Sequence, residues 1–127
     1  MRVLVFGTFD GLHEGHKAYL TQAKTFGDTI VASVPDDKTV HALKRKLPKQ
    51  SFEERKTALL ASGLVQEVFV SDNTQGGYNV LDRAQPDTIL VGYDQREIEQ
   101  SLQKHPSQIP VHRAQPFHPD IYKSSLL

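Results

Sequence analysis

Apolar stretches that read as buried strands alternate with helical patterns along this sequence, and this alternation constrains the fold more than any other feature. The expected strands cover residues 3–6, 29–34, 68–70, 88–91 and 111–113. The expected helices cover residues 16–26, 51–62, 79–84 and 97–104. Strands that alternate with helices in short βα units predict a parallel sheet with right-handed crossovers.

The length of the chain fits one such unit. A chain of 127 residues is long enough for one hydrophobic core and too short for two, so we expect a single domain over residues 1–127. The expected fold class is α/β, a Rossmann-like parallel sheet of about five strands with helices on both faces. Ligands bind such sheets beyond the carboxyl ends of the strands, where the strand order reverses. The turn after the first strand is therefore the first place to look for a site.

Charge and cysteine content exclude several classes of function. Fifteen basic residues balance fifteen acidic ones, so no overall field draws the chain to nucleic acid or anionic lipid. The absence of cysteine excludes disulfides, thiolate nucleophiles and cysteine-bound zinc, and it suits a cytoplasmic protein. Every apolar run is shorter than the roughly 18 residues of a membrane helix. We therefore expect a soluble, cytoplasmic protein with no nucleic-acid or membrane partner.

The turn after the first strand, GTFDGLHEGH at residues 7–16, has the composition of a phosphate site. Its glycines allow tight turns and close approach of a ligand, and the following helix presents free N–H groups and a positive dipole end. The spacing does not match the dinucleotide pattern G-x-G-x-x-G. His13 and His16 are one residue too close for the zinc-protease pattern H-E-x-x-H, so we expect no metal ligation by this pair.

The same ten residues resemble the signature of the cytidylyltransferase-like nucleotidyltransferases, G-x-F-D-x-x-H-x-G-H. The matching positions are Gly7, Phe9, Asp10, His13, Gly15 and His16. Residues 36–55 are similar to the family's stretch with two lysines, a proline and an E-x-R helix start, and residues 86–95 resemble its fourth strand and following Gly-x-Asp. The resemblance thus extends over most of the chain.

The resemblance implies transfer of a nucleotidyl group, in which a phosphate oxygen of an acceptor attacks the α-phosphorus of ATP or CTP and pyrophosphate leaves with Mg²⁺. Two unit charges at about 4 Å repel by roughly 4 kcal/mol at an effective dielectric constant of 20, so fixed donors must offset the charge. The expected catalytic residues are His13 and His16, as donors to the α-phosphate, with Lys44 and Lys46. In an extended segment both lysines face one side and Arg45 faces away.

Further residues are expected to bind the nucleotide. They are Gly7, Thr8, Phe9, Asp10, Gly15, Arg55, Gly92, Asp94, Arg113, Ser124 and Ser125. A second interpretation stays open for three of them: Asp10 as a brace for the turn, Asp94 as a helix cap, and Arg55 as a residue that serves only its helix. No protein ligand for a metal is assigned, because the phosphates are expected to hold most of the Mg²⁺.

Short sequence fragments indicate which substrates the chain uses. The fragments FGD, GYDQ and PDIYKSS look most like archaeal-type FAD synthases, which transfer AMP from ATP to FMN. Glycerol-3-phosphate cytidylyltransferases carry the C-terminal motif R-T-x-G-I-S-T. In this sequence only the arginine of that motif, Arg113, is retained. The favoured function is FMN adenylylation. The alternatives are a CTP-dependent cytidylyltransferase acting on glycerol-3-phosphate or a similar phospho-alcohol, and a non-catalytic nucleotide-binding module. The resemblance also implies a homodimer.

Overall fold

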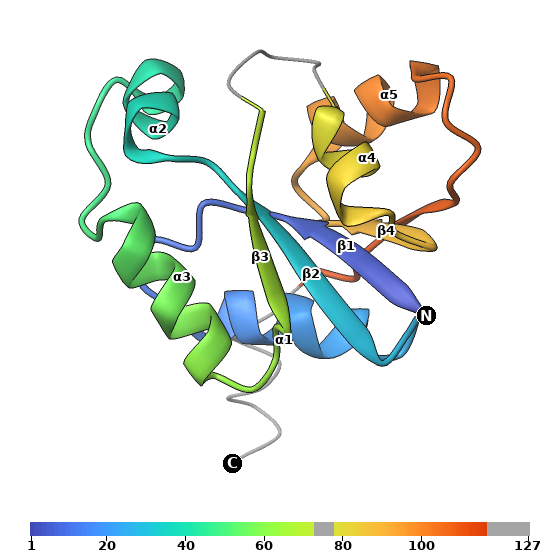
Figure 1. The fold of residues 1–127 in the computed structure, drawn as a ribbon, viewed down its shortest axis with the longest axis horizontal. Helices are drawn as coiled ribbons and strands as arrows, with labels where there is room; N and C mark the ends of the chain where they lie inside the picture. The colour runs from blue at the N-terminus through green and yellow to red at the C-terminus, as the bar shows by residue number, and fades with distance from the viewer. Residues whose placement is uncertain (73–77, 117–127) are drawn as a thin grey trace.

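The computed structural model describes residues 1–72 and 78–116, and within these ranges it has the predicted α/β architecture (Figure 1). The strands are β1 (Arg2–Phe6), β2 (Thr29–Val34), β3 (Glu67–Val70), β4 (Thr88–Val91) and β5 (Val111–Arg113). The helices are α1 (Glu14–Ala23), α2 (Asp37–Lys44), α3 (Phe52–Ala61), α4 (Asn79–Ala84) and α5 (Arg96–Lys104). The expected strands and helices are all present, and α2 is an additional helix.

All the strand pairs are parallel, and the order across the sheet is β3-β2-β1-β4-β5. The chain moves outward from β1 through β2 to β3 and then returns to the other side of β1 with β4. The strand order therefore reverses between β1 and β4. This is the position at which a doubly wound sheet opens a crevice for ligands.

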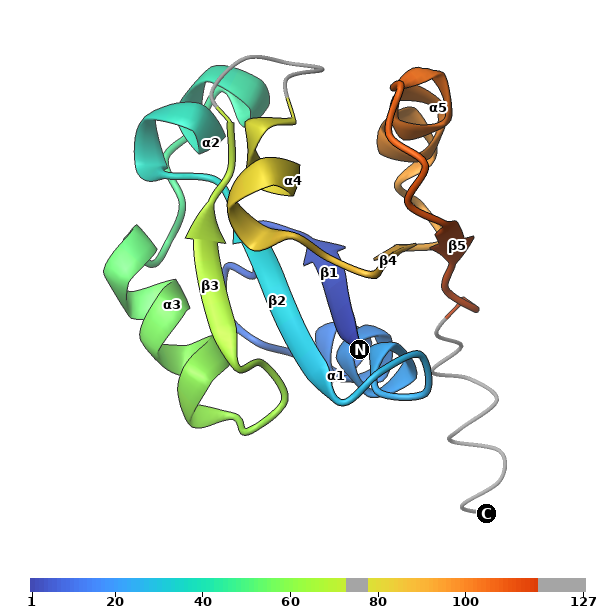
Figure 2. The ribbon, with the colours of Figure 1, turned by 45° about the vertical axis from the view of Figure 1, so that its right-hand side comes forward.

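Successive residues of β1 face opposite layers of helices, as expected for a strand buried on both sides. Val3 and Val5 pack in a cluster with Leu20 of α1 and Leu59 of α3. The intervening residues of β1 belong to a second cluster formed with α4 and α5. Figure 2 shows these two layers of helices around the sheet. Because both faces are covered, the apolar runs of the strands are almost fully buried.

The prediction of an extended segment around Lys44 and Lys46 is wrong. Asp36 caps a helix instead, by accepting a hydrogen bond from the Thr39 amide at 2.8 Å, and Lys44 is the last residue of that helix, α2. Arg45 follows in the left-handed conformation with φ of 58° and ends the helix. The alternation of side chains along a strand thus does not apply to these lysines.

No helix in the described part of the chain is both long and apolar enough to cross a membrane.

Candidate active site

The turn between β1 and α1 is tightly folded and depends on two glycines. Phe9 has a φ of 52°, which is uncommon for a bulky residue, and its side chain is only 2% exposed. A Cβ atom on Gly7 would lie 2.7 Å from the Phe9 ring, so only glycine fits there. Gly11 has a φ of 79°, a conformation that glycine adopts without strain. The backbone strain at Phe9 is held in place by its burial, a pattern common at functional sites.

The two histidines begin α1 by capping each other. His13 Nδ1 accepts hydrogen bonds from the amides of Gly15 at 3.1 Å and His16 at 3.4 Å, and His16 Nδ1 accepts from the His13 amide at 3.3 Å. The two rings stack with their centroids 3.7 Å apart, and the edge of Phe9 packs against His16 at 5.3 Å. The sequence pattern His-x-x-His is therefore a capping box made of imidazoles.

This capping determines which nitrogen of each ring carries the proton. Because Nδ1 of both rings accepts from a backbone amide, the hydrogen of the neutral ring is assigned to Nε2. Burial, followed by the neighbouring charges of His13 and Lys44, lowers the pKa of His16 to about 4. His16 is thus a neutral ring at pH 7 with its hydrogen on Nε2. A hydrogen-bond donor that needs no proton uptake suits the stabilisation of developing negative charge.

The turn is fastened from outside by the segment that precedes α3. Asp10 accepts hydrogen bonds from the amides of Lys49 and Gln50, both at 2.8 Å, and these bonds lower the pKa of Asp10 below its ordinary value. The Gln50 side chain in turn accepts from the Gly11 amide at 3.1 Å. Asp10 is therefore a brace for the turn, the second of its two interpretations, and it also borders the pocket described below.

Arg55 lies beneath this turn with none of its side chain exposed. Its guanidinium donates to the carbonyl oxygens of Thr8 at 3.0 Å, Pro35 at 2.9 Å and Gln50 at 3.2 Å, and it pairs with Asp37 at 2.8 Å. These partners come from three separate turns. Arg55 does not line the pocket, so the expectation that it binds the nucleotide gives way to a role in positioning the turns.

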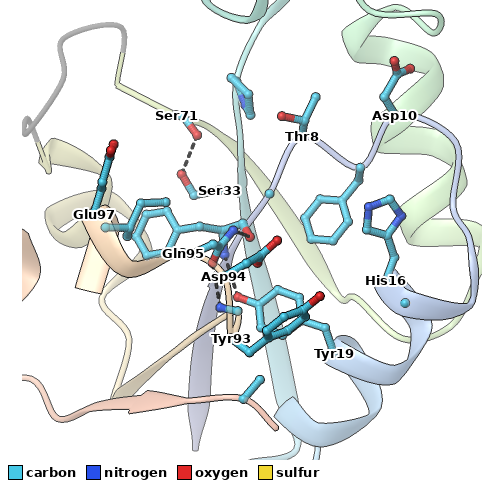
Figure 3. Close-up of a pocket in the computed structure, with 18 of the residues that line it drawn as sticks. Thr8, Asp10, His16, Tyr19, Ser33, Ser71, Tyr93, Asp94, Gln95 and Glu97 are labelled. Carbon is cyan, nitrogen blue, oxygen red and sulfur yellow. Dashed lines mark hydrogen bonds between the residues drawn. The ribbon is translucent and has the colours of Figure 1, made fainter. Parts of the chain in front are cut away.

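A cavity of about 1350 Å³ opens above the carboxyl ends of the strands, at the reversal of strand order (Figure 3). One wall is the β1–α1 turn with both histidines, and Lys44 and Leu43 of α2 border the same part. Ser33 and Ser71, which share a hydrogen bond of 2.7 Å, lie on another side. The loop after β4, with Gly92 and Asp94, the segment after β5, and residues of α4 and α5 form the rest of the lining.

Most of the predicted site residues lie together in this cavity. Those that line it are Gly7, Thr8, Phe9, Asp10, His13, Gly15, His16, Lys44, Gly92 and Asp94. Lys46 is exposed beyond the end of α2 and does not line it. Arg113 pairs with Glu99 at 2.7 Å on the surface, outside the cavity lining, because β5 directs it toward α5. Ser124 and Ser125 lie outside the described residues.

Two residues at the floor of the cavity were not among those predicted, Tyr19 and Gln95. Both bind backbone groups at the ends of β1 and β4. Tyr19 stands in the helical pattern as an ordinary apolar-face residue, and Gln95 stands in the quoted fragment GYDQ next to the predicted Asp94. The only sequence signal for either was the position of Gln95 at the carboxyl end of a strand.

Within residues 1–72 and 78–116, no group of three or more His, Cys, Asp or Glu side chains is placed to hold a metal ion.

Comparison with known proteins gives consistent relatives. The sequence model of the family described as Cytidylyltransferase-like matches residues 4–118. An FAD synthase of Thermococcus kodakarensis is 38% identical over 128 residues, covering 98% of this chain and 83% of that protein. An FAD synthase of Thermococcus onnurineus is 38% identical over 109 residues, covering 83% of this chain and 73% of that protein.

Solved structures agree in the fold. A lipopolysaccharide core biosynthesis protein from Thermoplasma volcanium is 27% identical, with a TM-score of 0.78, and the match covers 93% of this chain and 98% of that one. A pantoate-beta-alanine ligase from Francisella tularensis, 15% identical with a TM-score of 0.65, shares the fold alone. With the family matched over residues 4–118 and relatives 38% identical along most of their length, this chain belongs to the cytidylyltransferase-like family and is a nucleotidyltransferase.

Proposed function

We propose that this protein is an FMN adenylyltransferase, which transfers AMP from ATP to FMN and so forms FAD. The observation that carries the proposal is the pair of mutually capped histidines at the mouth of α1. Their Nδ1 atoms accept from backbone amides, which leaves Nε2 of each ring as the atom that we propose contacts a ligand. The N-terminus of α1 adds the positive end of its dipole at the same place.

In the proposed reaction an oxygen of the FMN phosphate attacks the α-phosphorus of ATP in line. A new P–O bond forms, the bond from the α-phosphorus to the oxygen that bridges to the β-phosphate breaks, and pyrophosphate leaves. Charge accumulates on the oxygens of the α-phosphate as this happens. His13 and His16 donate to these oxygens through Nε2.

We propose that Lys44 binds the β- and γ-phosphates. It borders the cavity at the carboxyl end of α2, and its charge is close enough to His16 to contribute to the lowered pKa of that ring. A cation near the leaving group offsets the repulsion between two anionic substrates. Lys46, whose side chain stands outside the cavity lining, is proposed only as a distant contributor to the field around the triphosphate.

The size of the cavity supports a large acceptor. Single-ligand pockets commonly enclose about 300–1,000 Å³, whereas this cavity measures about 1350 Å³. That volume suits two bulky substrates side by side, such as a nucleoside triphosphate and a flavin nucleotide. A small phospho-alcohol would leave much of it filled with water. The FAD synthases among the relatives point to the same acceptor.

Members of this family use a divalent metal ion, and we propose Mg²⁺. Mg²⁺ is usually held by substrate phosphates with one or two carboxylates and several waters. Asp94 is the carboxylate of the β4–α5 loop that is both exposed and part of the cavity lining, so it fits such a role. The homodimer stays a prediction, which sedimentation at micromolar concentration would test.

The direct experiment is incubation with Mg²⁺, one triphosphate and one acceptor, with separation of products by chromatography. ATP with FMN is expected to give FAD and pyrophosphate in equal amounts, and His16→Ala is expected to abolish most of this product. CTP with glycerol-3-phosphate serves as the second pair. Formation of a cytidylyl product from that pair, with no FAD from the first, would overturn the proposal. Binding without any pyrophosphate would indicate a nucleotide-binding module.

A further inference from the structure

The ladder of hydrogen bonds between β1 and β4 stops early, and two side chains take the place of the bonds that are missing. β1 pairs with β2 along its full length, from Arg2↔Thr29 to Phe6↔Ser33. It pairs with β4 only from Val3↔Thr88 to Val5↔Leu90. The two strands therefore separate at their carboxyl ends, directly below the cavity.

The register shows which bonds would come next. In a parallel pair, alternate residues direct both their N–H and their C=O to the same neighbouring strand. The Gly7 amide binds Ser33 of β2, so the backbone groups of Phe6 point toward β4. A continued ladder would join Phe6 N–H to Leu90 C=O and Gly92 N–H to Phe6 C=O. Neither of these direct bonds is formed.

The Tyr19 hydroxyl occupies the first gap. It accepts a hydrogen bond from the Phe6 amide at 3.1 Å and donates to the Leu90 carbonyl oxygen. Enclosure of this hydroxyl raises the pKa of Tyr19 above its ordinary value, so it remains a neutral group that can do both.

The Gln95 carboxamide occupies the second gap. Its Oε1 accepts from the Gly92 amide at 2.7 Å, and its Nε2 donates to the Phe6 carbonyl oxygen at 2.8 Å. Figure 3 shows both side chains at the floor of the cavity. Together they satisfy all four backbone groups that the missing ladder bonds would have used.

We infer that Gln95, together with Tyr19, is a positioning residue that holds β1 and β4 apart and fixes the loop of Gly92 and Asp94 for binding of the triphosphate substrate. We call the two side chains the Tyr19–Gln95 wedge. Without it, the two strands can pair two bonds further and narrow the floor of the cavity. This inference rests on the proposed function for the identity of the substrate, and on the hydrogen bonds alone for the geometry.

Gln95→Glu gives the sharpest test, because a carboxylate keeps the shape of the carboxamide and loses its donor. It can still accept from the Gly92 amide but faces the Phe6 carbonyl oxygen without a hydrogen.

For Gln95→Glu we expect the KM for ATP to rise about tenfold at pH 8, with kcat within about threefold of the unmodified enzyme. Gln95→Ala should show a similar rise. The matched control is Arg96→Ala, since Arg96 is exposed beside the wedge and does not line the cavity. Tyr19→Phe, which changes one atom, tests the other half of the wedge in a variant that keeps the ring packing.

A second measurement needs no substrate. Exchange of the Gly92 amide hydrogen, followed by NMR, should accelerate at least tenfold in Gln95→Ala and stay unchanged in Arg96→Ala. An enzyme that forms no FAD but shows this acceleration would refute the proposed function and support the wedge. An enzyme that forms FAD, while both Gln95 variants keep the unmodified KM and the slow exchange of Gly92, would overturn the wedge.

Discussion

Helices α1 and α3 begin with the same backbone device, built from different side chains. In α3, Ser51 Oγ accepts from the Glu54 amide at 3.2 Å and Glu54 Oε1 accepts from the Ser51 amide at 3.0 Å. In α1, His13 and His16 exchange the equivalent bonds through their Nδ1 atoms. Serine is among the best residues at this position, and histidine is not among the preferred caps.

The difference teaches what α1 gains from the less favourable residues. A serine hydroxyl that caps a helix has no second polar atom to offer, whereas an imidazole has Nε2 on the far side of the ring. The capping bond thus orients the ring and determines its tautomer at once. The capping pair of α3 lies outside the cavity lining, whereas both capping histidines of α1 line the cavity.

The largest expected effect comes from replacing His16, the less exposed residue of the α1 capping box. His16→Ala should lower kcat by about 10²-fold or more, because a donor to the developing charge is lost. The thermal unfolding midpoint should change by only a few degrees. Steady-state FAD formation and a calorimetric scan on the same sample measure both. A variant with unchanged kcat would remove His16 from the chemistry.

The next effect comes from replacing His13 by a better cap. His13→Asn keeps an oxygen that can accept from the amides of Gly15 and His16 but has no group that corresponds to Nε2. We expect kcat to fall about tenfold, less than for His16, because the exposed position of His13 weakens a hydrogen bond to phosphate. The unfolding midpoint should be equal or higher. A loss of stability together with activity would mean that His13 serves mainly as the cap.

In the capping box of α3, a substitution should lower stability and leave activity nearly unchanged, the opposite of the effect expected in α1. Ser51→Ala removes the side-chain bond to the Glu54 amide and should lower the free energy of unfolding by about 1 kcal/mol. Denaturant titration measures this, and kcat should stay within about twofold. A loss of activity as large as that of His13→Asn would contradict the separation of roles between the two helices.

A further effect is a pH dependence of stability that belongs to α1. In the folded chain the pKa of His16 is lowered from 6.5 to about 4, so below pH 6.5 the unfolded chain takes up a proton that the folded chain does not. Stability should therefore decrease as the pH falls from about 6.5 toward 4, and it should decrease less steeply in His16→Gln. Equal slopes in the two proteins, from denaturant titrations at pH 7 and 5, would show that His16 is not shielded.

Local patterns were enough to predict most of the fold. Short valine-rich runs predicted the strands, and the spacing from Ser51 to Glu54 predicted the start of α3, because these features depend on residues close in sequence. The resemblance of residues 7–16 to the family signature is confirmed by the family match. Helix α2 was missed although Asp36 followed by Thr39 is a capping signal.

The parts of the site that escaped prediction depend on distant contacts. The sequence left Arg55 either as a nucleotide-binding residue or as one that serves only its helix, and only the folded chain shows that its partners come from three turns. Tyr19 and Gln95 act between two strands whose separation no local pattern encodes. No local sequence pattern marks a side chain that replaces a backbone hydrogen bond, so such residues are found only in the three-dimensional structure.

The buried guanidinium of Arg55 has a consequence for how this protein can diversify. It joins the carbonyl oxygens of Thr8, Pro35 and Gln50, so the half of the cavity that holds the histidines is held as one unit. Substitutions that leave these three carbonyl contacts in place are expected to preserve the arrangement of the turns, so the rest of the chain can vary without displacing them.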